Sequence, residues 1–399
     1  MSLKILFVSR MNADFERWVS LVDYLHDKME VHMFHAKDLE RLENPAMYRV
    51  LRECGIEIQE YANLCWLHRM FLVFNSLARK FSLKFLWRIG QIFRSLGQRS
   101  LKLKVQKYLD QINPDAIFIT PYSKSTILDY EAIMHSHDWA LKNCRWILSA
   151  DHGSKIYFEK LKSTPILDNV NMYFASSDEA MKRTKGNDFI HPSINIGDLK
   201  HSAGFINRLK PYLRDIHIGK SIAIFLPSDI STNLKHRDFL LKLINRFRGD
   251  DRVESIIVKA HPNSSFTSFF ECVPKDTNIK LVSTEYNSCE VCQKADLVIS
   301  HPSSVLLEAL SLNTPVYLVK SLEKSETLHS YLDLNLPGMN FDEWLSTENI
   351  LDIPFSYNVD AFNRFAHNTS PKGENRELVY QFLINNCDQK PPYYSVDKK

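Results

Sequence analysis

Short apolar runs alternate with longer stretches of helical periodicity along the whole chain, a pattern typical of parallel strands connected by helices. A first series predicts six strands: Ile5 to Ser9, Glu30 to Phe34, Ile56 to Tyr61, Ala116 to Thr120, Trp146 to Ala150 and Met172 to Ala175. A second series predicts five: Ile222 to Leu226, Ser255 to Lys259, Lys280 to Val282, Leu297 to Ser300 and Val316 to Val319. The pattern therefore predicts an α/β protein with two doubly wound, Rossmann-like domains, whose ligands bind outside the carboxyl ends of the strands in an interdomain cleft.

The two series are separated by residues 191–216, where Pro192, Gly197 and Gly204 interrupt the periodicity and predict a linker. A length of 399 residues agrees with two domains, each large enough to bury its own core. We expect three parts: an N-terminal domain at 1–200, a C-terminal domain at 201–387 and a flexible tail at 388–399.

The positive charge is concentrated in one segment. The chain has 50 Lys and Arg against 47 Asp and Glu, yet residues 61–109 contain ten Lys or Arg and no acidic residue. Aromatic residues interleave with these cations, which predicts amphipathic helices. Three interpretations are open: contact with anionic lipid at a membrane, packing on the first domain with the cations in solvent, or binding of an acidic glycan. A basic excess confined to one segment argues against a nucleic-acid partner.

The cysteines and the N-terminus indicate the compartment. Seven scattered cysteines are typical of a reducing environment. Cys289 and Cys292 form a single CxxC without a second pair or nearby histidines, which favours a structural role over zinc. The apolar stretch before Arg10 is too short for a signal peptide or a membrane span. We expect a cytoplasmic protein without a metal, peripheral at the inner face of the cytoplasmic membrane if the basic segment binds lipid.

Three polar clusters each follow a predicted strand. They are Asp151-His152-Gly153-Ser154, His261-Pro262-Asn263-Ser264-Ser265 and His301-Pro302-Ser303-Ser304. Ser303 and Ser304 stand where a helix begins, and hydroxyls and free backbone N–H groups there favour an anion such as phosphate. His261, with Pro262 fixing the turn and Lys259 adding charge, could bind the same phosphate. The alternatives are a simple helix cap and a turn histidine.

These clusters, in this order over two α/β domains, resemble the motifs of GT-B glycosyltransferases that use CMP-activated ulosonic acids, which include bacterial sialyltransferases and Kdo (3-deoxy-D-manno-octulosonic acid) transferases. Residues 295–319 also resemble polymerases that use CDP-glycerol. The resemblance implies a GT-B fold and a metal-independent site. It places the phosphate of the cytidine nucleotide on Lys259, His261, Pro262, Ser303 and Ser304. Glu308 then contacts the ribose, or is a solvated helix residue.

Two carboxylates compete for the catalytic role. In a retaining enzyme Asp229 would attack the anomeric carbon and form a glycosyl-enzyme adduct. Its alternative role is a helix N-cap or Asx turn. In an inverting enzyme Asp151 would be the base that deprotonates the acceptor hydroxyl. His152 replaces an acidic position of the sialyltransferase-like pattern and is a further candidate base.

The resemblance predicts transfer of Kdo from CMP-Kdo to a bacterial surface glycan, either lipopolysaccharide O-antigen or capsule. The partners are then a CMP-activated sugar donor, bound by the C-terminal donor domain, and a glycan or glycolipid acceptor, presented by the N-terminal acceptor domain. The alternatives are an inverting sialyltransferase, a CDP-glycerol glycerophosphotransferase and a non-catalytic protein that binds glycan or nucleotide.

Overall fold

The structure is a computed structural model, and it describes residues 2–9, 12–35, 45–60, 62–119, 128–150, 169–176, 192–212, 221–227, 229–261, 266–283, 286–320, 334–347, 350–366 and 375–392. The chain forms two compact units. The boundary between them lies after Phe205, and the C-terminal segment from Asn375 returns to the first unit.

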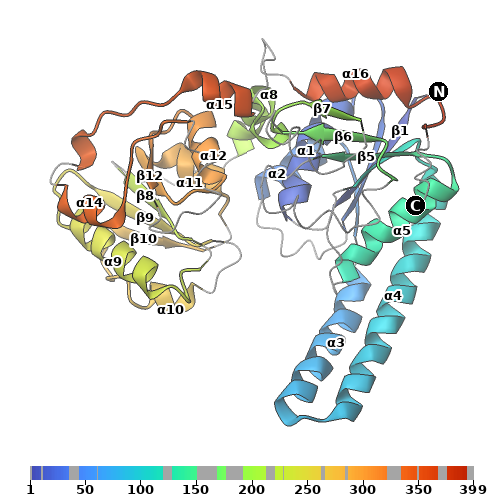
Figure 1. The fold of residues 1–399 in the computed structure, drawn as a ribbon, viewed down its shortest axis with the longest axis horizontal. Helices are drawn as coiled ribbons and strands as arrows, with labels where there is room; N and C mark the ends of the chain where they lie inside the picture. The colour runs from blue at the N-terminus through green and yellow to red at the C-terminus, as the bar shows by residue number, and fades with distance from the viewer. Residues whose placement is uncertain are drawn as a thin grey trace, which may run out of the picture. The chain divides into compact units, whose positions relative to one another are not determined.

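The first unit is built on a seven-stranded parallel sheet with the strand order β3-β2-β1-β4-β5-β6-β7 (Figure 1). Its strands are β1 (Lys4–Ser9), β2 (Glu30–His35), β3 (Ile58–Glu60), β4 (Ala116–Ile119), β5 (Trp146–Ala150), β6 (Met172–Ala175) and β7 (Ser193–Asn195). Its helices are α1 (Asn12–Leu25), α2 (Pro45–Glu53), α3 (Ala62–Phe81), α4 (Lys84–Ile112), α5 (Leu128–Lys142) and α16 (Arg376–Asn386), with the short helix η3 (Leu199–His201). The order 3-2-1-4-5-6 is that of a doubly wound fold.

Helices cover both faces of this sheet because successive side chains of a strand point to opposite faces. Leu6 and Val8 of β1 face one side, where they share a buried cluster with the second half of α4 and with α5. Phe7 faces the other side, where its ring stacks on Phe118 of β4 at 4.7 Å between centroids and lies 5.6 Å from Trp18 of α1. Both faces of the sheet are therefore covered by helices, which explains why its strands are continuous apolar runs in the sequence.

The last helix belongs to the first unit. Arg376 at the start of α16 is buried and donates to the carbonyl of Ser20 at 3.2 Å and to the carboxylate of Asp23 at 3.0 Å, both on α1. At the other end of α16, Phe382 packs edge-on against Trp146 of β5. From the sequence this helix was predicted to lie in the second domain, because nothing in its own pattern shows which sheet it covers. The predicted flexible tail is also wrong for its first part, since the carbonyls of Gln389 and Pro392 accept hydrogen bonds from Trp146 at 2.7 Å and Asn171 at 3.2 Å.

The second unit is built on a six-stranded parallel sheet with the order β10-β9-β8-β11-β12-β13. Its strands are β8 (Ser221–Phe225), β9 (Ser255–Lys259), β10 (Ile279–Val282), β11 (Leu297–Ser300), β12 (Val316–Val319) and β13 (Gly338–Met339). Its helices are α8 (Ala203–Leu209, at the boundary), η4 (Lys210–Tyr212), α9 (Leu234–Arg248), α10 (Thr267–Phe270), α11 (Ser288–Lys294), α12 (Val305–Ser311), α14 (Phe341–Ser346), η5 (Ile350–Asp352) and α15 (Val359–Ala366). Both units therefore repeat the predicted doubly wound architecture.

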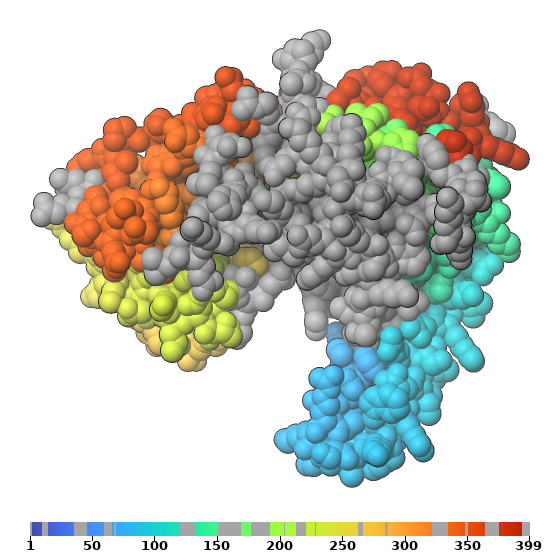
Figure 2. Space-filling view, viewed as in Figure 1, coloured from blue at the N-terminus to red at the C-terminus, as the bar shows by residue number. Residues whose placement is uncertain are grey.

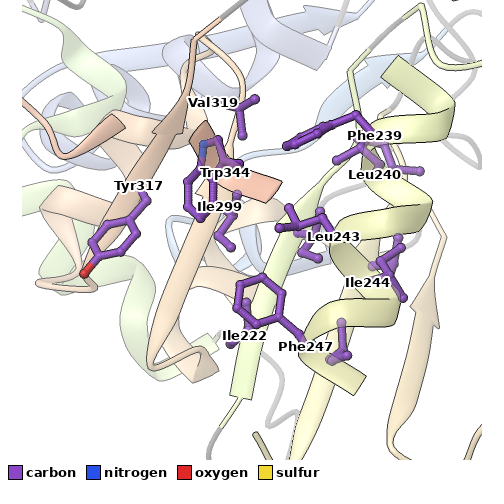
Figure 3. Packing of buried hydrophobic residues seen from close by; sticks show 14 of the residues in the cluster. Ile222, Phe239, Leu240, Leu243, Ile244, Phe247, Ile299, Tyr317, Val319 and Trp344 are labelled. Carbon is purple, nitrogen blue, oxygen red and sulfur yellow. The ribbon is translucent and has the colours of Figure 1, made fainter. Parts of the chain in front are cut away.

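Strand alternation separates the core of the second unit into two layers. Ile222 and Ile224 of β8 pack with the buried face of α9 and with Trp344 of α14 (Figure 3). Ala223 and Phe225 pack on the opposite side with α11 and α12. Cys292 of α11 is buried in this second layer. This location agrees with the structural role that was favoured for the CxxC pair.

Two edge strands were missed by the sequence analysis. β7 lies inside the predicted linker 191–216 and pairs with β6, and the helix-like stretch after it forms α8 and η4. β13 pairs with β12 through only two residues. Neither strand is long enough to give an apolar run, because edge strands of two or three residues bury few side chains.

Gly338 permits the close approach of β13 to β12. A Cβ atom at this position would lie 2.8 Å from the carbonyl oxygen of Leu318 and 2.9 Å from its Cβ. We therefore expect Gly338→Ala to destabilise the folded protein by about 2 kcal/mol, since the strand must move to relieve the overlap. Urea unfolding measures this effect. Gly249→Ala is the control, because its Cβ would meet neighbours only at 3.7 Å and beyond; an equal loss in both variants would contradict the explanation.

Candidate functional site

The site lies where the strand order of the second sheet reverses. β8 is the first strand of the unit and pairs with β9 on one side and with β11 on the other. In such sheets the loops that leave β8 and β11 diverge to opposite faces, and ligands bind in the crevice between them. The segments after these two strands carry Asp229 and His301.

Asp229 forms a pair with His236. The carboxylate Oδ1 lies 2.9 Å from Nδ1 of His236, and Oδ2 accepts a hydrogen bond from Asn233 at 3.0 Å. Asn233 also caps α9, where its side chain accepts from the backbone N–H of His236 at 3.3 Å. The cap starts the helix at Leu234 and places His236 in its first turn, so helix geometry fixes the ring opposite the carboxylate. Sequence analysis left open an Asx turn or N-cap for Asp229; the N-cap is Asn233.

His301 lies beside this pair. It follows the last residue of β11, is only 8% exposed, and its ring centroid lies 5.1 Å from that of His236. Phe341 at the start of α14 packs edge-on against both rings, at 5.5 Å from His236 and 6.2 Å from His301. Within the described residues, neither ring nitrogen of His301 has a hydrogen-bond partner. Two buried polar atoms at a strand end are thus available to a bound molecule.

Electrostatics assign different protonation states to these groups. Burial opposes ionisation of Asp229, but the hydrogen bonds from His236 and Asn233 outweigh it and hold the pKa of the carboxyl below its ordinary value. Burial, and secondarily the nearby His236, lower the pKa of His301 to about 4, against a smaller opposing effect of Asp229. At neutral pH the site therefore contains a carboxylate and a neutral imidazole at His301.

The predicted serine cluster opens α12. Ser304 is the N-cap residue, but its side chain makes no capping hydrogen bond, and the hydroxyl of Ser303 lies 3.2 Å from that of Ser300. Glu308 is 1% exposed, so it is not the solvated helix residue that was the alternative in the sequence analysis.

His261 follows β9, on the side of β8 opposite to His301. Because adjacent strands are about 4.8 Å apart, the ends of β9 and β11 lie about 10 Å from each other. Burial, and then the charge of Lys259, lower the pKa of His261. Lys259 itself is 3% exposed, and its ammonium donates to the carbonyl of Ala260 at 3.0 Å. Asp151, His152 and Pro262 lie outside the described residues.

Neither His236 nor His301 was among the site residues predicted from the sequence. His301 was open to detection, because it directly follows an apolar run and precedes the serine pair. His236 had no such signal, since it lies inside an amphipathic helix seven residues after its carboxylate. Together the pair and His301 provide what acid–base chemistry requires, a largely buried imidazole oriented by a partly exposed carboxylate. In the part of the chain that the structure describes, no group of three or more His, Cys, Asp or Glu side chains is arranged to hold a metal ion.

The chain has the GT-B-like fold, with two parallel sheets of Rossmann type. It is similar to the UDP-GlcNAc 2-epimerase from Neisseria meningitidis bound to UDP-GlcNAc, with a TM-score of 0.62, 13% identity and coverage of 96% of this chain and 100% of that one. It is also similar to the UDP-GlcNAc 2-epimerase from Methanocaldococcus jannaschii, with a TM-score of 0.60, 12% identity and coverage of 95% and 100%. UGT2 from Phytolacca americana, complexed with UDP-2fluoro-glucose and pterostilbene, matches at a TM-score of 0.53, 10% identity and coverage of 97% and 100%. No protein-family model and no curated protein sequence matches the chain.

These comparisons correct the predicted function. The predicted transfer of Kdo from CMP-Kdo is wrong, because several of the similar structures are UDP-GlcNAc 2-epimerases matched over almost their whole length. The expectation of two Rossmann-type sheets in a GT-B-like fold is confirmed. The error has a physical origin: a histidine after one strand and serines at the next helix suit the phosphate of any nucleotide at a switch point, so they do not identify the base or the sugar.

Proposed function

We propose that this chain is an enzyme that acts on a UDP-sugar, and that its reaction is epimerisation at C2 of a UDP-N-acetylhexosamine such as UDP-GlcNAc. The observation that carries the proposal is the Asp229–His236 pair beside the buried His301, at the switch point of the second sheet. The likeness to structures of UDP-GlcNAc 2-epimerases supports the choice of reaction.

The chemistry of the pair suits this reaction. Epimerisation at C2 breaks the C2–H bond on one face of the sugar and forms a new one on the opposite face. The electron pair of the broken bond forms a C1–C2 double bond as the C1–O bond to UDP breaks, and UDP adds back to C1 as a proton reaches C2 from the other side. A group that accepts or gives a proton at C2 is therefore required. His236, oriented by Asp229, is the group that we assign to proton transfer. His301 is neutral at pH 7, and we assign its two ring nitrogens to hydrogen bonds with the substrate.

We assign the diphosphate to the opening of α12 and the neighbouring strand end. Ser303 and Ser304 supply hydroxyls there, His261 and Lys259 lie across β8, and the buried Glu308 is the proposed ribose contact. In this arrangement the Asp229–His236 pair and the residues assigned to phosphate all follow the carboxyl ends of strands in one sheet. A single nucleotide-sugar could therefore contact both groups.

The experiment is incubation of the full chain with UDP-GlcNAc in D₂O, followed by proton NMR. The proposal expects a second UDP-N-acetylhexosamine with deuterium at C2, because the returned proton comes from solvent. Calorimetric titration with UDP and with CMP tests the nucleotide separately, and UDP should bind more tightly. Absence of epimer and of deuterium exchange, with no preference for UDP, would overturn the proposal.

A second candidate is glycosyl transfer from a UDP-sugar, which the similarity to UGT2 favours. The same incubation separates the two, since a transferase releases UDP when an acceptor is added and leaves the hydrogen at C2 in place. Deuterium at C2 without an acceptor supports epimerisation alone.

The serine pair gives a graded test of the phosphate assignment. Ser303→Ala and Ser304→Ala are each expected to raise the KM for the UDP-sugar about fivefold with little change in kcat, because each removes one hydrogen bond made in both ground and transition states. Ser346→Ala on the exposed end of α14 is the control. If both variants kept the wild-type KM, the phosphates would have to be bound elsewhere.

A further inference from the structure

A hairpin of two long helices carries most of the exposed apolar side chains of the chain. α3 and α4 run side by side and are joined by a tight turn at Ser82 and Leu83 (Figure 1). Among the described residues, ten of the sixteen large hydrophobic side chains that are exposed belong to this hairpin. Four of them surround the turn: Phe81, Leu83, Phe85 and Trp87, with exposed fractions of 56%, 41%, 57% and 52%. An apolar group of this size is expected to be covered by something.

The same turn is strongly basic. Arg79, Lys80, Lys84 and Arg88 are all exposed and alternate with the four apolar side chains. No Asp or Glu occurs anywhere in 61–109, so the segment supplies no carboxylate of its own to neutralise them. We call residues 79–88 the hairpin tip.

The hairpin is built to hold its tip away from the sheet. The second half of α4 is anchored in the core of the first unit through Leu101, Val105 and Leu109. From Leu101 back to Lys84 the helix extends about 25 Å at the usual rise per residue, and Figure 2 shows this part projecting from its unit. The two helices pack against each other, and the ring of Phe74 in α3 stacks on that of Phe93 in α4 with 5.5 Å between the ring centroids.

We propose that the hairpin tip binds the surface of a membrane that contains anionic lipids, with Phe81, Leu83, Phe85 and Trp87 in the interfacial layer and the four cations on lipid phosphates. Aromatic and aliphatic side chains interleaved with Lys and Arg suit that layer, because it is apolar on one side and negatively charged on the other. Association of two copies through this surface would bring the four cations of each tip together without a carboxylate from the segment to neutralise them. Among the described residues, no helix has the length and apolar character to cross a bilayer, so the contact is one of adsorption.

The test is cosedimentation of the full chain with vesicles of phosphatidylcholine and phosphatidylglycerol, compared with vesicles of phosphatidylcholine alone. Binding should require the anionic lipid and weaken as salt is raised. Lys80→Gln with Lys84→Gln should weaken it about 25-fold, at roughly fivefold per charge. Phe85→Ser with Trp87→Ser should weaken it at least about tenfold.

Matched controls change the same residue types elsewhere. Lys142→Gln with Lys275→Gln removes two exposed charges, and Val359→Ser with Leu378→Ser removes two exposed apolar side chains, both outside the hairpin. Neither pair should alter vesicle binding. In addition, bromine on the lipid chains should quench the fluorescence of Trp87, and Trp87→Phe should lose most of that quenching.

Three outcomes would overturn the proposal: no binding to anionic vesicles, equal binding to neutral ones, or an equal loss in the control variants. A concentration-dependent dimer that the Phe85→Ser and Trp87→Ser changes abolish, without vesicle binding, would assign the tip to a second copy instead. The reaction with UDP-sugars in solution is independent of this contact, so the tip variants should keep it whether or not the membrane proposal holds.

Discussion

Replacing His236 with glutamine is expected to lower kcat for the UDP-sugar reaction by about 10²- to 10⁴-fold, the share that a positioned acid–base group contributes. KM should change little, because the ring acts on the proton in transit rather than on the bound nucleotide. We expect a loss of kcat of this size because His236 lies in the first turn of α9, where its Nδ1 is 2.9 Å from Oδ1 of Asp229 and the ring is held in place. The measurement is steady-state kinetics of epimer formation with UDP-GlcNAc.

Asp229 acts through His236 and is a positioning residue. Asp229→Asn should therefore lower kcat without raising KM, and Asp229→Glu should restore part of the loss by returning a carboxylate. The control is Asp238→Asn, which removes a carboxylate paired with Lys242 on the exposed face of the same helix. A near-normal kcat in His236→Gln would remove this pair from the reaction.

Acid should destabilise the protein through His301 by about 3 kcal/mol between pH 6.5 and pH 4. Above pH 6.5 the ring is neutral in both the folded and the unfolded chain, so it adds no pH dependence. As the pH falls, the unfolded chain binds a proton at the ordinary pKa of 6.5, whereas burial keeps the pKa of His301 in the folded protein at about 4. The difference of about 2.5 pH units gives the stated free energy.

Urea unfolding at pH 7 and at pH 4.5 measures this effect. The other titrating groups contribute to both proteins, so the quantity of interest is the difference between the wild type and His301→Gln. The variant should lose less stability on acidification, whereas His26→Gln, in the first unit, should lose as much as the wild type. Equal pH dependence of stability in the wild type and in His301→Gln would mean that the folded protein does not lower the pKa of this ring.

Most of the fold was predictable because strands buried on both faces read as apolar runs. β1, β5, β9 and β11 were located within a residue of their observed ends. The parallel order then followed from the alternation with helices. β7 and β13 were missed because a strand at the rim of a sheet buries one or two side chains and leaves no run to detect.

The position of the site was predictable, but its chemistry was less so. The rule that ligands bind at strand ends selected Asp229, His261 and the serine pair, all of which follow strands of one sheet. It could not select His236, whose partnership with Asp229 depends on the helix turn that Asn233 caps. It also could not distinguish a cytidine from a uridine nucleotide, because it selected residues by their suitability for phosphate, a group common to both.

The return of α16 to the first unit has a practical consequence for anyone who wishes to study half of the protein. A fragment that ends at Phe205 would lack α16, whose Arg376 binds α1 and whose Phe382 packs on Trp146. Apolar side chains that α16 covers would then be exposed to water. Supplying residues 375–392 as a separate peptide, or fusing them to the fragment through a glycine-rich tether, should restore its solubility. Apart from residues 43–46, the other unit is a single stretch of the chain, 206–369.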